Sequence, residues 1–199
     1  MPPSIPAHDS PHQHQALGAR FGSLGFAVIT LSDTRTEETD ASGKFIREAV
    51  AAAGHCVVRY NLVRDDANTV VPALKAALAD PDVAIVVSNG GTGIARRDNA
   101  WECIAGLLEK RLDGFGELFR MLSFQEIGAA AMLSRAVGGV SSGKILFALP
   151  GSTGAVRLAM HQLILPQAGH LHFELHKHEP ASGAIEQTPS AARSQVDRP

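Results

Sequence analysis

Short apolar blocks alternate along the chain with stretches in which apolar residues recur at helical spacing. The apolar blocks cover residues 24–31, 55–63, 83–89 and 145–149. Blocks of this length and density are typical of strands buried on both faces of a parallel sheet. The stretches at residues 45–53 and 70–78 have the spacing of crossover helices. The pattern therefore predicts an α/β fold built on a mostly parallel sheet.

Polar and glycine-rich loops follow three of the predicted strands. The first loop ends with D-A-S-G at residues 40–43. The second loop is N-G-G-T-G at residues 89–93, and the third is P-G-S-T-G at residues 150–154. Ligands of open α/β sheets bind at the carboxyl ends of the strands. We therefore expect the backbone donors of the two glycine loops, with the hydroxyls of Ser152 and Thr153, to share one phosphate site.

The loop after the third strand has the composition of an anion-binding loop. It consists of Gly90, Gly91, Thr92 and Gly93. Glycines let backbone N–H groups approach a ligand without Cβ clashes, and Arg96 and Arg97 add positive charge. The spacing is neither that of a dinucleotide fold nor that of a Walker loop. A plain glycine bend before a helix capped by Asn99 and Glu102 explains the same residues about as well.

Several acidic and hydroxyl residues of these loops have a structural explanation beside the functional one. Asp40 or Ser42 could cap the helix that follows the first strand, because both side chains satisfy free N–H groups at a helix start. Asp65 and Asp66 end the second strand, where caps and turn formers are also common.

A further glycine-rich segment, G-G-V-S-S-G-K-I at residues 138–145, is similar in spacing to a Walker loop. Ile145 stands where that loop needs a hydroxyl, and the flanking residues have the character of two strands. We predict a hairpin turn at residues 141–143.

Two further segments allow more than one interpretation. The stretch after residue 112 crowds five large apolar side chains, which indicates core packing or, alternatively, a subunit contact or pocket wall. They are Phe115, Leu118, Phe119, Leu122 and Phe124. In the segment H-L-H-F-E-L-H-K-H at residues 170–178, four of the nine residues are histidine. We expect an exposed, partly strand-like terminus there, in preference to a metal site.

Composition and charge narrow the class of protein. A net charge of −2 and a pI near 6.5 give no electrostatic support to nucleic-acid or membrane-surface binding. Cys56 and Cys103 lie in apolar segments and are expected to be reduced core thiols. No apolar run has the length of a membrane span, and no signal pattern opens the chain, so we expect a cytoplasmic protein. We expect one domain over residues 21–178, between a disordered arm at 1–20 and a disordered tail at 179–199.

Several of these motifs, taken together and in order, resemble the MoaB/MogA family of molybdopterin-binding proteins. The resemblance spans residues 24–178. It rests on D-A-S-G, N-G-G-T-G-I-A-R-R-D, G-F-G-E-L-F-R-M-L-S-F-Q-E-I-G, L-S-R-A-V-G-G-V and L-F-A-L-P-G-S-T-G-A-V. Within the family, L-F-R-M-L-S-F-Q-E-I-G and P-G-S-T are most similar to the MoaB branch.

The resemblance implies a three-layer α/β fold, a homotrimer or homohexamer, and a reaction at the terminal phosphate of molybdopterin. In active members that phosphate attacks the α-phosphate of Mg-ATP and gives adenylylated molybdopterin and pyrophosphate. Asp65 and Asp98 match family carboxylates, for which the resemblance implies roles in binding Mg²⁺ and positioning substrate. Arg97 and Ser152 are expected to contact phosphate. The remaining matched substrate-binding positions are Asp40, Ser42, Gly90, Gly91, Thr92, Gly93 and Gly151.

Two positions depart from the family pattern. Asn89 stands where Thr or Ser is usual, and Ala100 stands where R-D-x-T usually supplies a hydroxyl. Each change removes a possible hydroxyl ligand, although an amide can still donate and accept. The sequence thus leaves three hypotheses open: a molybdopterin adenylyltransferase, a molybdopterin-binding or assembly protein without turnover, and a generic nucleotide binder.

Overall fold

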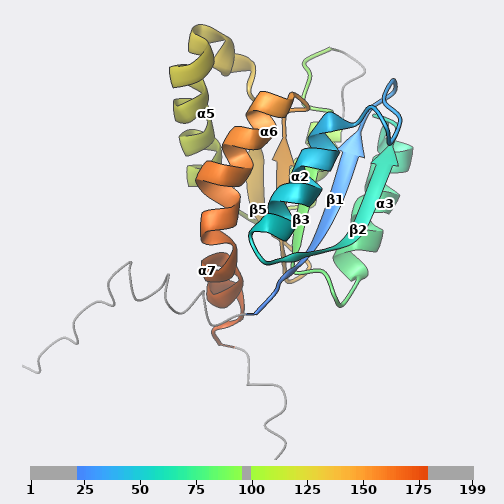
Figure 1. Cartoon of the computed structure of the whole chain (residues 1–199), viewed down its shortest axis with the longest axis vertical. Coiled ribbons are helices and arrows are strands. Elements are labelled where there is room, and N and C mark those ends of the chain that lie inside the picture. The colour runs from blue at the N-terminus through green and yellow to red at the C-terminus, as the bar shows by residue number, and fades with distance from the viewer. Residues whose placement is uncertain (1–21, 96–99, 179–199) are drawn as a thin grey trace, which may run out of the picture.

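The structure, a computed structural model, describes residues 22–95 and 100–178 (Figure 1). Its helices and strands are β1 (Gly25–Leu31), α2 (Ala41–Ala52), β2 (Cys56–Val63), α3 (Ala67–Ala79), β3 (Ile85–Asn89), α4 (Ala100–Gly106), β4 (Lys110–Arg111), α5 (Asp113–Ile127), η1 (Gly128–Leu133), β5 (Val137–Ser141), β6 (Lys144–Leu149), α6 (Thr153–Ala159), η2 (Met160–Ile164) and α7 (Leu165–His176). The predicted arm at 1–20 and tail at 179–199 lie outside the described residues.

The strands form one six-stranded sheet in the order β2-β1-β3-β6-β5-β4. The first four of these run parallel, and β5 and β4 form an antiparallel edge. In the parallel part Thr30 pairs with Asn89, and Asn89 pairs with Leu149. The carboxyl ends of β1, β3 and β6 are therefore level, and the loops that follow them leave the sheet side by side.

Helices cover both faces of the sheet, as the three-layer α/β prediction requires. Phe26 and Val28 of β1 face a core built with α2, α5, α6 and α7, whereas Ala27 and Ile29 face a core built with α3 and α4. Figure 1 shows α2 and α6 in front of the sheet. The central strands β1 and β3 are buried along their whole length, which explains why their sequences are apolar except at Thr30, Ser88 and Asn89 near their carboxyl ends.

The hairpin predicted in place of a Walker loop is confirmed. Ser141 pairs with Lys144, and the two residues between them, Ser142 and Gly143, have φ values of 51° and 68°. Two consecutive residues with positive φ form the turn that matches the twist of a two-stranded ribbon.

The histidine-rich terminus is a helix, so the predicted strand-like segment is wrong. Residues 170–176 belong to α7, where Ala168 is buried and Leu171 and Leu175 pack against the core. These three residues have the spacing of one helix face, a period that the alternating histidines mask. Within the described residues, no group of three or more His, Cys, Asp or Glu side chains is arranged to hold a metal ion.

The predicted burial of both cysteines is also wrong. Cys56 is exposed at the start of the edge strand β2, and Cys103 on α4 is half-buried; both are free thiols. Among the described residues, no helix is long and apolar enough to cross a membrane.

The crowded apolar segment forms α5, and it divides its side chains between two environments. Phe115 and Phe119 face the core, with Phe115 against Phe147 at 4.7 Å between ring centroids. Leu118 and Phe124 are exposed on the other side. Leu122 also packs against the core, so core packing explains three of the five side chains.

Candidate functional site

The two glycine turns after β3 and β6 meet at the carboxyl edge of the sheet. The Gly90 N–H donates to the Leu149 carbonyl at 2.9 Å. A Cβ built on Gly151 would lie 3.2 Å from the Cα of Gly90, so the turns touch through their backbones. The structure thus brings Gly90, Gly91 and Gly151 together, as the sequence predicts.

Gly90 and Gly91 both have left-handed backbones, with φ values of 99° and 64°. A Cβ on Gly90 would lie 2.2 Å from the Leu31 carbonyl oxygen, and one on Gly91 would lie 2.8 Å from a carboxylate oxygen of Asp65. Asp65 is therefore beside the glycine loop, although it comes from the end of another strand. Only glycine allows the chain to turn this closely between β1 and Asp65.

Asp40 is a buried carboxylate that organises the start of α2. One of its oxygens accepts the Gly43 N–H at 3.0 Å, which makes Asp40 the helix cap, and the other accepts the Tyr60 hydroxyl at 2.8 Å. A Cβ on Gly43 would lie 2.1 Å from the Asp40 carboxylate, which explains the glycine of D-A-S-G. Of the two explanations for Asp40, the structure gives direct support to capping.

Ser42 connects the first and third loops, whereas Ser152 caps the helix that follows the third loop. The Ser42 hydroxyl donates to the Gly151 carbonyl at 2.9 Å and lies 3.2 Å from the Thr153 hydroxyl. The Ser152 hydroxyl oxygen accepts the Ala155 N–H at 3.3 Å and so caps α6. Asp66 likewise caps α3, which leaves Asp65 as the carboxylate beside the glycines.

Thr92 is almost buried and Gly93 continues the loop, but the structure does not describe residues 96–99. Arg97 and Asp98, both predicted site residues, lie in that stretch, as do Arg96 and the predicted cap Asn99. Glu102, the predicted capping partner of Asn99, forms an ion pair with Arg135.

Both departures from the family pattern fall at buried positions. The side-chain amide of Asn89 donates to the Thr30 hydroxyl at 2.9 Å, inside the sheet edge. Ala100 is fully buried, and a Cβ on Gly91 would lie 2.7 Å from the Cβ of Ala100. In this structure neither side chain faces solvent, so each serves to pack the site rather than to line its opening.

Two arginines at this edge were missed as site residues. Arg135 donates to the Gly93 carbonyl at 2.7 Å, pairs with Glu102 and lies 4.5 Å above the Trp101 ring. The Arg135 guanidinium holds the pKa of Glu102 below its usual value. Arg35 joins the Gly151 carbonyl to Asp40. Both arginines donate to carbonyl oxygens of residues that are distant in the sequence, and no local motif predicts such contacts.

A titration of the only tyrosine tests the Asp40 network. Burial and the hydrogen bond to Asp40 raise the pKa of Tyr60 to about 12. Because the folded pKa is raised, the stabilisation from neutral Tyr60 is complete below the unfolded pKa of about 10 and is lost as the pH rises through about 12. Ultraviolet absorbance of tyrosinate measures this directly. We expect Asp40→Asn to lower the Tyr60 pKa; an unchanged value would contradict the network.

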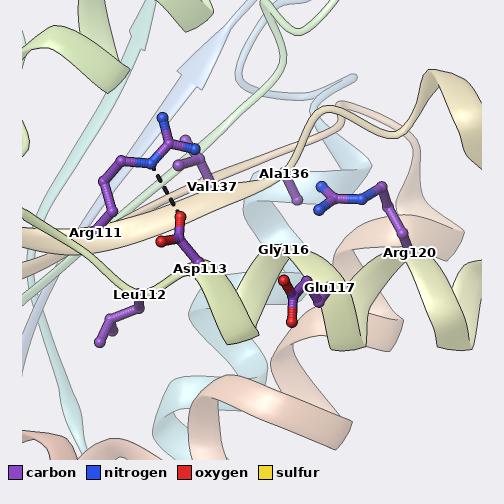
Figure 2. A pocket seen from close by; sticks show the side chains of 8 residues that line it. All are labelled: Arg111, Leu112, Asp113, Gly116, Glu117, Arg120, Ala136 and Val137. Carbon is purple, nitrogen blue, oxygen red and sulfur yellow. Dashed lines mark hydrogen bonds and ion pairs between the residues drawn. The ribbon is translucent and has the colours of Figure 1, made fainter.

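The cavities beside α5 are separate from these loops. One, of about 210 Å³, lies between α5 and the start of β5 (Figure 2). Figure 2 shows Arg111 paired with Asp113 and Arg120 extending towards Ala136. A larger groove of about 660 Å³ runs between α5 and α7. None of the described site candidates lines either cavity.

Comparison with known proteins identifies similar chains over most of the described domain. A family profile described as "Probable molybdopterin binding domain" matches residues 27–170. The Bacillus cereus protein named "Molybdenum cofactor biosynthesis protein B" is 52% identical over 151 residues, which cover 75% of this chain and 89% of that protein. The protein of the same name from Bacillus subtilis is 48% identical over the same shares.

Solved structures agree with these matches. A crystal structure of a "Molybdenum cofactor biosynthesis protein B" is 51% identical and superposes with a TM-score of 0.76, covering 78% of this chain and 97% of that one. The "tungsten cofactor synthesizing protein MoaB" from Pyrococcus furiosus is 37% identical, with a TM-score of 0.70 over 77% of this chain and 97% of that one. The similarity thus extends from the motifs to the whole sheet and its helices.

Proposed function

Because the chain belongs to the molybdopterin-binding domain family of molybdenum cofactor biosynthesis proteins, we propose that it adenylylates molybdopterin with ATP. A terminal phosphate oxygen of molybdopterin forms the new bond to the α-phosphorus of ATP. The bond between the α-phosphorus and the bridging oxygen breaks, and pyrophosphate leaves with the electron pair. A cytoplasmic location agrees with the free thiols of Cys56 and Cys103.

The observation that carries this proposal is the meeting of two glycine turns beside a carboxylate and a guanidinium. Gly90 and Gly151 are in contact, Asp65 lies beside Gly91, and Arg35 bonds the Gly151 carbonyl. Two phosphate groups repel each other, so a catalyst must align them and supply positive charge and N–H donors where negative charge develops. The glycine loop through Gly93, with Arg97 and the Ser152 hydroxyl, supplies the phosphate contacts in this account.

Asp65 fits the role of a Mg²⁺ ligand, together with Asp98. Mg²⁺ prefers oxygen ligands and is held in nucleotide sites by one or two carboxylates plus the phosphates, so a larger acidic cluster is not needed. One carboxylate oxygen of Asp65 lies at the edge of the glycine loop. When bound, Mg²⁺ offsets the charge of the triphosphate. The carboxylate can lie beside the glycine loop because Gly91 has no Cβ to clash with it.

The alternative is a molybdopterin-binding or assembly protein without turnover. Loss of hydroxyls at Asn89 and Ala100 motivates that alternative, whereas the burial of both side chains favours the enzyme. A third candidate, a generic nucleotide binder, predicts tight ATP binding that ignores the pterin.

The only tryptophan, Trp101, reports on binding because its backbone N–H donates to the Gly91 carbonyl and its ring lies under Arg135, which donates to the Gly93 carbonyl. Titration of its fluorescence with molybdopterin and with ATP separates the third candidate from the first two. Product analysis with both ligands present separates the enzyme from the binding protein.

We also propose that the chain forms a homotrimer or a hexamer built from trimers. Large apolar side chains are exposed on α5 and on η1, and together we call them the apolar face. It comprises Leu118, Met121, Phe124, Ile127, Met132 and Leu133. Phe124 is 61% and Met132 is 80% exposed, which is unusual for a monomer. The groove between α5 and α7 adjoins this face through Leu118.

Introducing a charge on the apolar face tests this oligomer. We expect Phe124→Glu to shift the protein to a smaller species at micromolar concentration, because a carboxylate would be buried without a partner. Sedimentation velocity measures the change. Val58→Glu, on the edge strand β2 and 37% exposed, is the control. A monomeric unmodified protein, or an oligomer unaffected by Phe124→Glu, would contradict the proposal.

A further inference from the structure

The loop after β1 holds one guanidinium at the meeting point of all three candidate loops. Arg35 Nη2 donates to the Gly151 carbonyl at 2.9 Å, and Nη1 lies 3.4 Å from the Asp40 carboxylate. The loop itself is fixed, since the Arg35 N–H donates to the Ser32 hydroxyl and the Ser32 N–H donates to the Val63 carbonyl. Figure 1 shows the end of β1 and the start of α6 at the same edge of the sheet.

Asp40 orients this guanidinium. The carboxylate is fully buried and is already held by the Gly43 N–H and the Tyr60 hydroxyl, so it has little freedom to move. A side chain paired with a fixed carboxylate loses less conformational entropy when it later binds a ligand. Arg35 is thus positioned before any substrate arrives.

Arg35 also has hydrogen-bonding capacity left over. A guanidinium has five N–H groups, and the contacts with Gly151 and Asp40 use two of them. Three N–H groups remain, and the side chain is 31% exposed. The planar arrangement of these donors matches the oxygens of a phosphate group.

The Gly151 carbonyl beside Arg35 is already hydrogen-bonded. Its oxygen accepts from both Arg35 and the Ser42 hydroxyl, each at 2.9 Å. Without these hydrogen bonds, the partial negative charge of the carbonyl oxygen would repel a phosphate at this position. The two donors remove that repulsion where the Gly151 turn touches Gly90.

We propose that Arg35 is a positioning and specificity residue that binds a phosphate oxygen of the substrates while it fixes the Gly151 turn. The inference rests on the proposed function and adds a residue that the motifs do not include. The oxygen can belong to the phosphate of molybdopterin or to that of ATP, which share this chemistry.

The test compares Arg35→Gln with the unmodified protein by Trp101 fluorescence, using molybdopterin, dephosphorylated molybdopterin and ATP as separate ligands. Losing a charged hydrogen bond to phosphate should weaken binding about tenfold or more. We expect that loss for a phosphate-bearing ligand and no change for the dephosphorylated pterin. A loss confined to molybdopterin identifies its phosphate as the partner, and one confined to ATP identifies the nucleotide.

Arg59→Gln is the matched control, because Arg59 is also paired with a carboxylate, Asp80 at 3.1 Å, and is 40% exposed. Arg35→Lys keeps the charge but not the forked donors, so it should restore phosphate binding in part; it also serves as the test if Arg35→Gln does not fold. Equal weakening for both pterins would show a merely structural role and overturn the inference, as would unchanged binding of every ligand. Failure of the unmodified protein to bind either substrate would instead overturn the proposed function, and the inference with it.

Discussion

Gly90→Ala is expected to lower the free energy of unfolding by about 3 kcal/mol, because it combines a left-handed backbone with a backbone clash. Gly90 has a φ of 99°, and the new Cβ would lie 2.2 Å from the Leu31 carbonyl oxygen. Leu31 belongs to a buried central strand and cannot move away cheaply. The glycine turn should therefore open, with loss of ligand binding as well as stability.

Gly54→Ala isolates the clash. Gly54 also has a positive φ, 83°, but a Cβ there would meet nothing within 4 Å. Its substitution should cost about 1 kcal/mol and leave ligand binding intact. Denaturant unfolding at one fixed protein concentration measures both variants. Equal losses of stability at the two positions would show that the contact between Gly90 and β1 is not what holds the turn.

Asp65→Asn is expected to reduce adenylyl transfer by at least about 100-fold while leaving the fold intact. The asparagine keeps the shape of the side chain beside Gly91 but removes the negative charge that the proposal assigns to Mg²⁺ binding. The turnover rate with saturating Mg-ATP and molybdopterin is the measurement, and circular dichroism checks the fold.

Asp66→Asn is the control for Asp65→Asn because it changes the neighbouring carboxylate. Asp66 accepts the N–H groups of Asn68 and Thr69 at the start of α3, and asparagine is also a good helix cap. Turnover should be unaffected. If Asp65→Asn retained full turnover, or if both variants lost it alike, the assignment of Asp65 to the reaction would be wrong.

The sheet was predictable because its strands are buried on both faces. The pattern of residues 83–89 predicts a buried strand, which the structure contains as β3. Strands β1, β3 and β6 end level, so the loops identified by composition meet at the carboxyl edge of the parallel sheet. The glycines of the turns were predictable for a similar reason: close backbone approach excludes every other residue.

Contacts between distant loops could not be predicted in the same way. Arg35 acts through the Gly151 carbonyl, 116 residues away, and Arg135 through the Gly93 carbonyl, so neither has a local signature. Asn89 looked like a lost ligand, but it is buried against Thr30. The terminal histidines alternate like a strand, although Leu171 and Leu175 bind that segment to the core as a helix.

The most direct test of the proposed activity is product analysis after the protein is incubated with molybdopterin and Mg-ATP. The account predicts adenylylated molybdopterin and pyrophosphate in equal amounts, formed only when both substrates are present. Molybdopterin that is bound at saturating protein but recovered unchanged would contradict adenylyl transfer and leave a binding protein of the same fold.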